Sequence, residues 1–140
     1  MANFLFNSFK QKIQDGSIDL DTDEIRVILL TSSAAPDQDT WEDYADITNE
    51  VVGTGYAAGG QAVTTPTVTK DNTNNRGVFD GDNMVWTGST ITARWALTLK
   101  WTGTPGTSWL IGAIDFVSDK SSVAEDFRIN WHPDGIHHLG

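Results

Sequence analysis

The stretch from Ser89 to Thr102 alternates apolar and polar side chains with a period of two. Its apolar residues occupy every second position, and they are Ile91, Ala93, Trp95, Leu97, Leu99 and Trp101. The positions between them carry mainly threonine, arginine and lysine. A helix would spread these residues around its whole circumference, whereas a strand collects them on one buried face and leaves the other face in water. So large an apolar face needs a cover, for which a second sheet is the usual solution.

The same kind of pattern recurs along the chain, with short strand-like runs separated by clusters of glycine, proline, asparagine and aspartate. Roughly eight such runs at the spacing of an all-β domain, without a βαβ rhythm, predict a mainly β fold. We therefore predict that residues 1–140 form a single domain. Its expected architecture is an antiparallel β-sandwich, of which the jelly roll is one form, with one short N-terminal helix.

Individual strands follow from the local pattern. In residues 25–31, Ile25, Val27 and Leu29 point to one face and Ile28 and Leu30 to the other, which predicts a strand at least partly buried on both faces. Residues 109–117 form an almost continuous apolar run, expected at the centre of the sandwich and paired with residues 89–102. Polar residues 119–126 are expected to form a loop, and the alternation in residues 127–132 predicts a last long strand.

Two further stretches provide candidate interface residues. Residues 4–15 predict an amphipathic helix whose stripe includes Phe6 and Phe9. Such a stripe normally packs on its own domain, and the alternative is that it docks onto a partner. In the loop at residues 33–49, Asp39 or Thr40 is expected to cap a helical turn. Trp41 and Tyr44, at the end of that turn, complete the candidate interface residues.

Charge and cysteine content limit the partners. The chain has 9 basic and 19 acidic residues, a net charge of −10 and no cysteine. Nucleic acid is a poor partner because phosphates require clustered lysine and arginine. Disulfides and thiolate metal sites are excluded. No apolar run approaches the roughly 20 residues of a membrane span, and no export leader is evident, so we expect no membrane association.

Two groups of residues are candidates for metal binding, a run of aspartates and the histidines near the C-terminal end of the sequence. Asp19, Asp21 and Asp23 match the first ligands of an EF-hand loop, but Glu24 and Leu30 stand where the turn glycine and the bidentate glutamate belong. A solvated turn is the prediction there, and a looser calcium site is the alternative.

The three histidines, His132, His137 and His138, are expected on the surface. Adjacent histidines on a strand point to opposite faces, which disfavours a shared zinc ion. No cofactor is predicted.

No motif of an activated nucleophile is present, so we predict that the protein is not an enzyme. Two alternatives remain open. Paired carboxylates could serve an envelope-glycan hydrolase, since spacing along the sequence does not decide their separation in space. Trp41, Trp86 and Trp109 could instead form the platform of a carbohydrate-binding module.

Five segments carry a resemblance that spans nearly the whole chain: FKQKIQDGSIDLDTDEIRVILLTSS, EVVGTGYAAGG, VFDGDNMVWT, LIGAIDF and FRINWHPDGI. In this order they resemble a family of small structural proteins of tailed-bacteriophage virions. The resemblance implies synthesis in the host cytoplasm and a place in the virion, with the major capsid protein or other virion proteins as partners. Its implied role is head decoration, as a cement protein on the outside of the head. Rival roles are a head–tail connector or neck protein and a tail component. A homo-oligomer would suit such a role, and a trimer would match the local threefold sites of a capsid.

Overall fold

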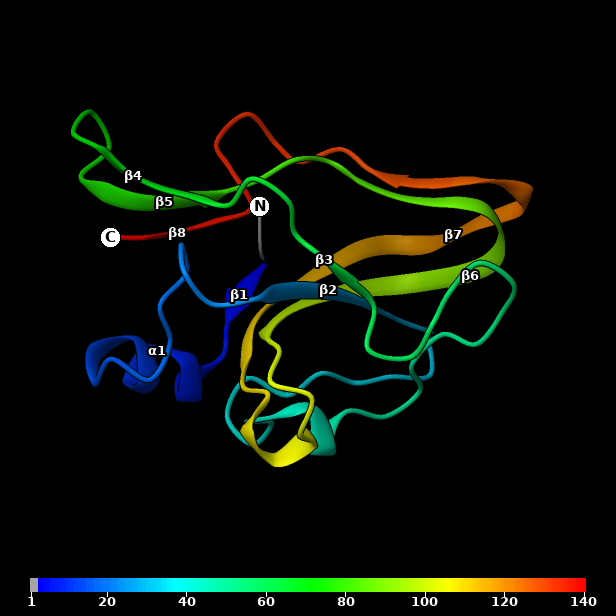
Figure 1. The fold of residues 1–140 in the computed structure, drawn as a ribbon, viewed down its shortest axis with the longest axis horizontal. Helices are drawn as coiled ribbons and strands as arrows, with labels where there is room; N and C mark the ends of the chain where they lie inside the picture. The colour runs from blue at the N-terminus through cyan, green and yellow to red at the C-terminus, as the bar shows by residue number, and fades with distance from the viewer. Residues whose placement is uncertain (1–2) are drawn as a thin grey trace.

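The structure is a computed structural model that describes residues 3–140 (Figure 1). Its elements, in chain order, are β1 Phe4–Leu5, α1 Asn7–Gln14, β2 Ile25–Leu30, the 3-10 turn η1 Tyr44–Asp46, β3 Gln61–Ala62, β4 Thr67–Asp71, β5 Arg76–Asp80, β6 Met84–Lys100, the 3-10 turn η2 Pro105–Thr107, β7 Leu110–Ile129 and β8 His137–Leu139. The strands form two antiparallel sheets, in the orders β1-β7-β6-β2-β3 and β4-β5-β8. The predicted mainly β, sandwich-like architecture with one short helix is confirmed.

The antiparallel ribbon of β6 and β7 is the backbone of the fold. Residues 96–98 pair in register with residues 112–114, as the sequence predicts, and β2 pairs with the other side of β6. Figure 1 shows that the ribbon turns at the right-hand end of the view and returns above its own first half. The prediction of a loop at residues 119–126 is wrong, because β7 continues as one strand to Ile129.

Both faces of β6 are buried near its C-terminal end. Leu97 and Leu99 on one face are fully buried, and so are Ala96 and Thr98 on the other face, which alternation assigns to water. Figure 1 shows the segment between β2 and β3 running beneath the five-stranded sheet and the three-stranded sheet lying above it. The face predicted to be wet is therefore partly covered, because a tertiary layer closes over it.

Helix α1 packs on its own domain. Phe6, which precedes the helix, and Phe9 both have 0% of their surface exposed. They therefore present nothing to a partner, and the docking alternative for these two residues is corrected. The predicted cap at Asp39 or Thr40 is also wrong. The short turn begins later, and the Asp43 carboxylate accepts the backbone N–H of Ala45.

Between residues 3 and 140, the structure contains no helix with the length and apolar character needed to cross a bilayer.

Candidate interaction surface

The ribbon bends where its two strands differ in length. Trp95 pairs with Asp115 and Ala93 pairs with Lys120, so only Arg94 on β6 faces residues 116–119 on β7. Extra residues on one strand form a bulge, which bends the ladder and increases its twist. The register therefore predicts a local bend of the ribbon at Arg94.

An ion pair holds this bulge. Arg94 Nε lies 2.6 Å from Asp115 Oδ1, and the same carboxylate oxygen accepts the backbone N–H of Val117 at 2.7 Å. The hydrogen bond from Arg94 and that from Val117 lower the pKa of Asp115. Because both side chains of the pair are partly exposed, we interpret this contact as fixing the geometry of the bulge more than as a large source of stability.

A second irregularity lies further along the ribbon. Gly88 and Ala124 both have positive φ angles, of 58° and 49°, and the ladder changes register around them. The Thr90 hydroxyl accepts the N–H of Ala124 at 2.9 Å, and the buried hydroxyls of Ser89 and Ser122 are 2.8 Å apart. Polar side chains thus satisfy the backbone that the irregularity leaves unpaired.

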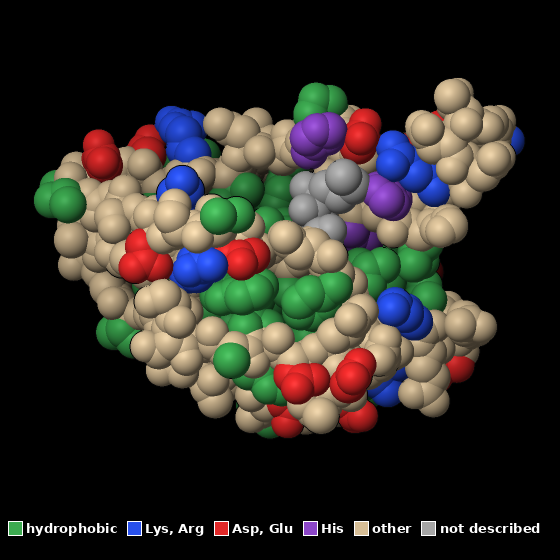
Figure 2. All heavy atoms as spheres, turned by 180° about the vertical axis from the view of Figure 1, so that it is seen from behind, with side chains coloured by type: hydrophobic (Ala, Val, Ile, Leu, Met, Phe, Trp, Pro, Cys, Tyr) green, Lys and Arg blue, Asp and Glu red, His purple; other side chains and the backbone are tan. Residues whose placement is uncertain are grey.

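Three exposed apolar side chains lie on the half of the molecule that holds the ribbon, and we call them the valine tip: Val52 and Val123, which share one hollow, and Val117, at the bulge opposite Arg94. The exposed fractions of Val52, Val117 and Val123 are 96%, 77% and 74%, the three highest among the exposed large hydrophobic residues. Val52 and Val123 line one shallow hollow of about 420 Å³ together with Thr90 and Thr92. Figure 2 shows hydrophobic side chains projecting at this end of the molecule, on the left of that view.

Val117 also has a φ of +72°, in the left-handed region. A β-branched residue is rarely found there, because its branched Cβ crowds the backbone, and the conformation costs about 1–3 kcal/mol. Glycine or asparagine would form the same bulge with less strain. Since 77% of this side chain is in water, the isolated molecule gains little packing in return.

A partly buried carboxylate fastens the long segment between β2 and β3. Glu50 accepts hydrogen bonds from the hydroxyls of Tyr44 and Tyr56 and from the N–H of Gly59. Burial raises the pKa of Tyr44 to about 12 and raises that of Tyr56 as well. Both carboxylate oxygens of Glu50 accept hydrogen bonds, so this residue serves as a clasp that fixes the segment between β2 and β3.

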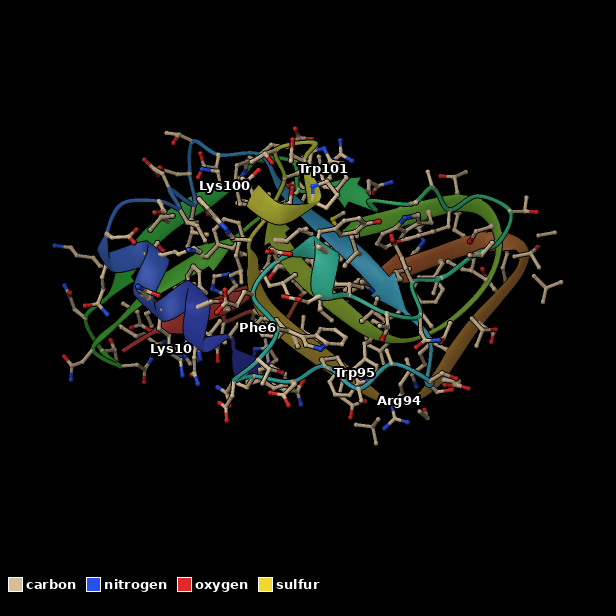
Figure 3. All side chains as sticks on the ribbon, turned by 90° about the horizontal axis from the view of Figure 1, so that it is seen from below. Phe6, Lys10, Arg94, Trp95, Lys100 and Trp101 are labelled. Carbon is tan, nitrogen blue, oxygen red and sulfur yellow. The ribbon has the colours of Figure 1, made fainter. Side chains whose placement is uncertain are left out.

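Tyr44 belongs to this clasp, and its ring also meets Trp101 edge-on at 5.6 Å. Trp41 is half-buried against the core, so of the four candidate interface residues it is one of two that keep exposed surface, the other being Tyr44. Trp86 is buried and contacts the rings of Tyr56 and Phe127, which removes it from any sugar platform. Trp109 is partly buried, and Lys12 Nζ lies 4.4 Å from its ring centroid. Figure 3 shows Trp95 of β6 well apart from Trp101, which follows the end of that strand.

The three aspartates do not converge on a common point. Asp23 lies 3.1 Å from Lys100 Nζ and accepts the N–H of Asp19 at 2.8 Å. A hydrogen bond between the carboxyls of Asp19 and Asp21 lowers the pKa of Asp19 and raises that of Asp21. In the part of the chain that the structure describes, no three His, Cys, Asp or Glu side chains are arranged to hold a metal ion.

His137 corrects the prediction that all three histidines lie on the surface. Its side chain is 2% exposed, whereas His132 is exposed beside Asp134. Alternation in β8 turns His137 inward, and burial lowers its pKa to about 3, so the imidazole is neutral near pH 7.

The chain matches no protein-family model, no curated protein and no solved structure.

The valine tip is the functional candidate that the sequence did not single out. Val117 precedes the polar stretch of residues 119–126 that was predicted to be a loop, and Val123 lies within it. A local signal against a loop was the presence of these β-branched residues, which favour a strand.

Proposed function

We propose that the protein is a structural component of a tailed-bacteriophage virion that acts by binding and not by catalysis. Its proposed place is the outside of the head, as a decoration protein attached to the major capsid protein. The resemblance of the five quoted segments supports the virion assignment. The valine tip supports a role in binding, and it is the observation on which this part of the proposal depends.

The physical argument rests on Val117. Its backbone strain is not repaid by burial within the molecule, because most of its side chain is exposed. Burying a valine side chain contributes about 1.5–3 kcal/mol, which is comparable to the cost of the strain. Contact with another molecule would therefore recover what the isolated protein loses. Val52 and Val123, which line a separate shallow hollow, provide further exposed apolar surface for contact.

The net charge fits the same location. A protein with 19 acidic and 9 basic residues is repelled by packaged DNA and is better placed on the outer surface of the shell. We further propose that copies assemble as trimers at local threefold positions, where one trimer could present three valine tips to the lattice.

The decisive experiment adds labelled protein to heads of the parent phage that lack it, followed by cryo-electron microscopy and counting of bound copies. Binding across the whole shell supports decoration. A single ring at one vertex would instead make the protein a neck or connector component, and binding to tails alone would make it a tail component. Absence of binding to every virion part would overturn the proposal.

A further inference from the structure

A trough lies along the outer edge of β7, on the half of the ribbon that returns above its first half in Figure 1. It has a volume of about 340 Å³, and five consecutive residues, 126–130, line it together with Phe116, Lys120 and Ser121. Neighbouring residues of a strand point to opposite faces of the sheet. Five residues in a row reach one hollow only at the edge of a strand, so the trough follows the edge of β7.

Within residues 3–140, no other strand pairs with this part of the edge. β7 lies between β1 and β6 in its sheet, but β1 pairs only with Gly112 and Ala113. Residues 127–129 pair with β6 on their other side. The edge of a sheet presents backbone N–H and C=O groups to which another chain can add. The trough therefore offers backbone groups as well as side chains.

Two hydrogen bonds show which backbone groups face the trough. The C=O of Glu125 accepts the hydroxyl of a β6 serine at 3.1 Å, and the N–H of Trp131 donates to an asparagine just before β6 at 2.9 Å. Backbone groups of a strand alternate in direction from one residue to the next. The groups of Phe127 and Ile129 therefore face β6, whereas the N–H and C=O of Arg128 face outward.

The floor of the trough is apolar. Phe127 and Ile129, on the inner face of β7, are 5% and 8% exposed. The half-buried ring of Phe116 lies 6.4 Å from that of Phe127, measured between centroids. Lys120 and Arg128 are exposed and line the same trough. An occupant thus meets apolar surface and basic groups together.

The basic groups have unused capacity to bind an anion. Arg128 Nη2 lies 2.9 Å from Asp126, whose other oxygen accepts the N–H of Gly88, so the acid in the trough is already engaged. Among the residues that the structure describes, the Lys120 ammonium has no hydrogen bond, ion pair or ring contact. Every other lysine and arginine there, Lys70 excepted, has such a partner. A carboxylate is the complementary group for these side chains.

We propose that the trough binds an extended acidic segment of a partner protein, which adds to the edge of β7 as an antiparallel strand. A residue opposite Arg128 exchanges both backbone hydrogen bonds with it and places a carboxylate beside the guanidinium. The residues before and after it direct apolar side chains onto Phe127 and Ile129. Lys120 adds attraction for acidic residues of the segment. All backbone contacts involve β7 itself, so the added strand reaches them directly.

This inference goes beyond the proposed function and does not depend on the valine tip. The first test titrates a capped peptide, Ser-Thr-Val-Glu-Val-Thr-Ser, into the full chain and measures amide hydrogen exchange by nuclear magnetic resonance. Exchange should slow at the amide of Arg128 and stay unchanged at those of Phe127 and Ile129, which already bond to β6. Absence of binding, or equal slowing at all three amides, would overturn the proposal.

Modified peptides test the strand geometry without changing the protein. Methylating the backbone nitrogen of the glutamate removes a hydrogen bond to Arg128 and should weaken binding by about 10-fold, the effect of one backbone bond and the methyl group in its place. Methylating the nitrogen of the following valine, which faces away from β7, is the matched control and should weaken binding less. Equal effects of the two modifications would contradict strand addition.

Two lysine variants test the charge. Lys120→Met keeps the length of the side chain and removes its charge, so it should weaken peptide binding by about 2- to 5-fold, the effect of one exposed ion pair. Lys70→Met is the control, because Lys70 is the other unpaired lysine and lies on β4, and it should leave affinity unchanged. A peptide with lysine in place of glutamate should bind more weakly still. Equal affinity of the acidic and basic peptides would contradict the assignment of an acidic partner.

A last measurement separates a partner protein from a second copy of this chain. Sedimentation of the chain alone should show no association that the acidic peptide reverses. Association that the peptide does reverse would assign the edge to self-assembly and overturn the proposal of a partner. None of these measurements uses phage heads, so their failure is separable from failure of the head-binding proposal.

Discussion

The two ends of the molecule handle apolar surface in opposite ways. At the bend of the ribbon, Val117 is held in a strained conformation and directed into water. At the other end, Gly77 leaves a hollow in a strand that could have accommodated a side chain without strain. One end displays apolar groups that the fold does not need, and the other lacks a side chain that the fold could have used.

Neither arrangement maximises the stability of the isolated chain. An exposed strained valine costs free energy, and so does a strand glycine with empty space around it. Departures from local consistency are expected at functional sites, where another molecule completes the packing. The comparison therefore suggests two independent contact surfaces, a projection and a recess, on opposite ends of one domain.

The largest expected effect concerns the projection. Replacing Val52, Val117 and Val123 together by threonine keeps their shape but adds a hydroxyl that loses its water on binding. At about 1.5 kcal/mol for each valine, the free energy of binding to phage heads should weaken by about 4.5 kcal/mol, or roughly 2000-fold in affinity. The measurement is a binding isotherm on heads, with Val68→Thr at the other end as the matched control. Unchanged affinity of the triple variant would show that the valine tip is not the capsid contact.

The stability of the folded protein should fall in acid because of His137. Burial, with a smaller contribution from His138, lowers the pKa of His137 from its ordinary 6.5 to about 3. Between these values the unfolded chain binds a proton that the folded protein does not, so the free energy of unfolding should fall as pH decreases through this window. The loss approaches about 1.4 kcal/mol per pH unit.

This slope can be isolated with urea unfolding at pH 7, 6 and 5. Wild type and His137→Phe share every other titrating group, so the difference between their slopes reports His137 alone. Identical slopes in the two proteins would show that this imidazole protonates normally in the folded state.

A smaller effect on stability should distinguish the backbone strain of Val117 from the exposure of its side chain. Val117→Gly should raise the free energy of unfolding by about 0.5–1 kcal/mol, because relief of the left-handed strain outweighs the added entropy of the unfolded chain. Val123→Gly is the control, since Val123 has similar exposure and no positive φ, and it should lower stability by about 0.5–1 kcal/mol. The measurement is thermal or urea unfolding of both variants. If their free energies of unfolding changed in the same direction, Val117 would not be strained in the way proposed.

The smallest expected effect concerns the glycine of the recess. Gly77→Ala should raise the free energy of unfolding by about 0.4–1 kcal/mol, because the added methyl group meets no clash and restricts the unfolded chain. Gly60→Ala should be strongly destabilising by comparison, since the chain approaches closely there. Urea unfolding of both variants would check the contrast, and a destabilised Gly77→Ala would mean that the hollow is needed for folding.

Much of the sheet could be read from local pattern. The alternation in residues 89–100 and the apolar run at residues 25–30 predicted β2 and the second half of β6, because side chains on a strand alternate between faces whatever the fold. The pairing of residues 89–102 with residues 109–117 also followed, since a short turn-rich connection favours an antiparallel neighbour.

The valine tip could not be read in the same way. Residues 119–126 have the composition of a loop, but they form a strand because their backbone pairs with β6 in a ribbon that needs no apolar face. Which side chains such a ribbon exposes depends on its bulges, and the bulge at residues 116–119 arises from long-range register. Phe9 was placed correctly on the helix whereas Phe6 precedes it, and only the surrounding sheets determined that both side chains are buried.

The sequence by itself determined the fold class, the principal strands and the short helix, because period and composition act over a few neighbouring residues. Only the tertiary structure decided that Ala96 and Thr98 are buried, that His137 Nε2 has no hydrogen-bond partner among residues 3–140, and that Val117 is strained and exposed. Each of these depends on which distant segment lies against the residue. Layer packing, strand register and the space left by a glycine are set by the whole chain at once, so no local pattern encodes them.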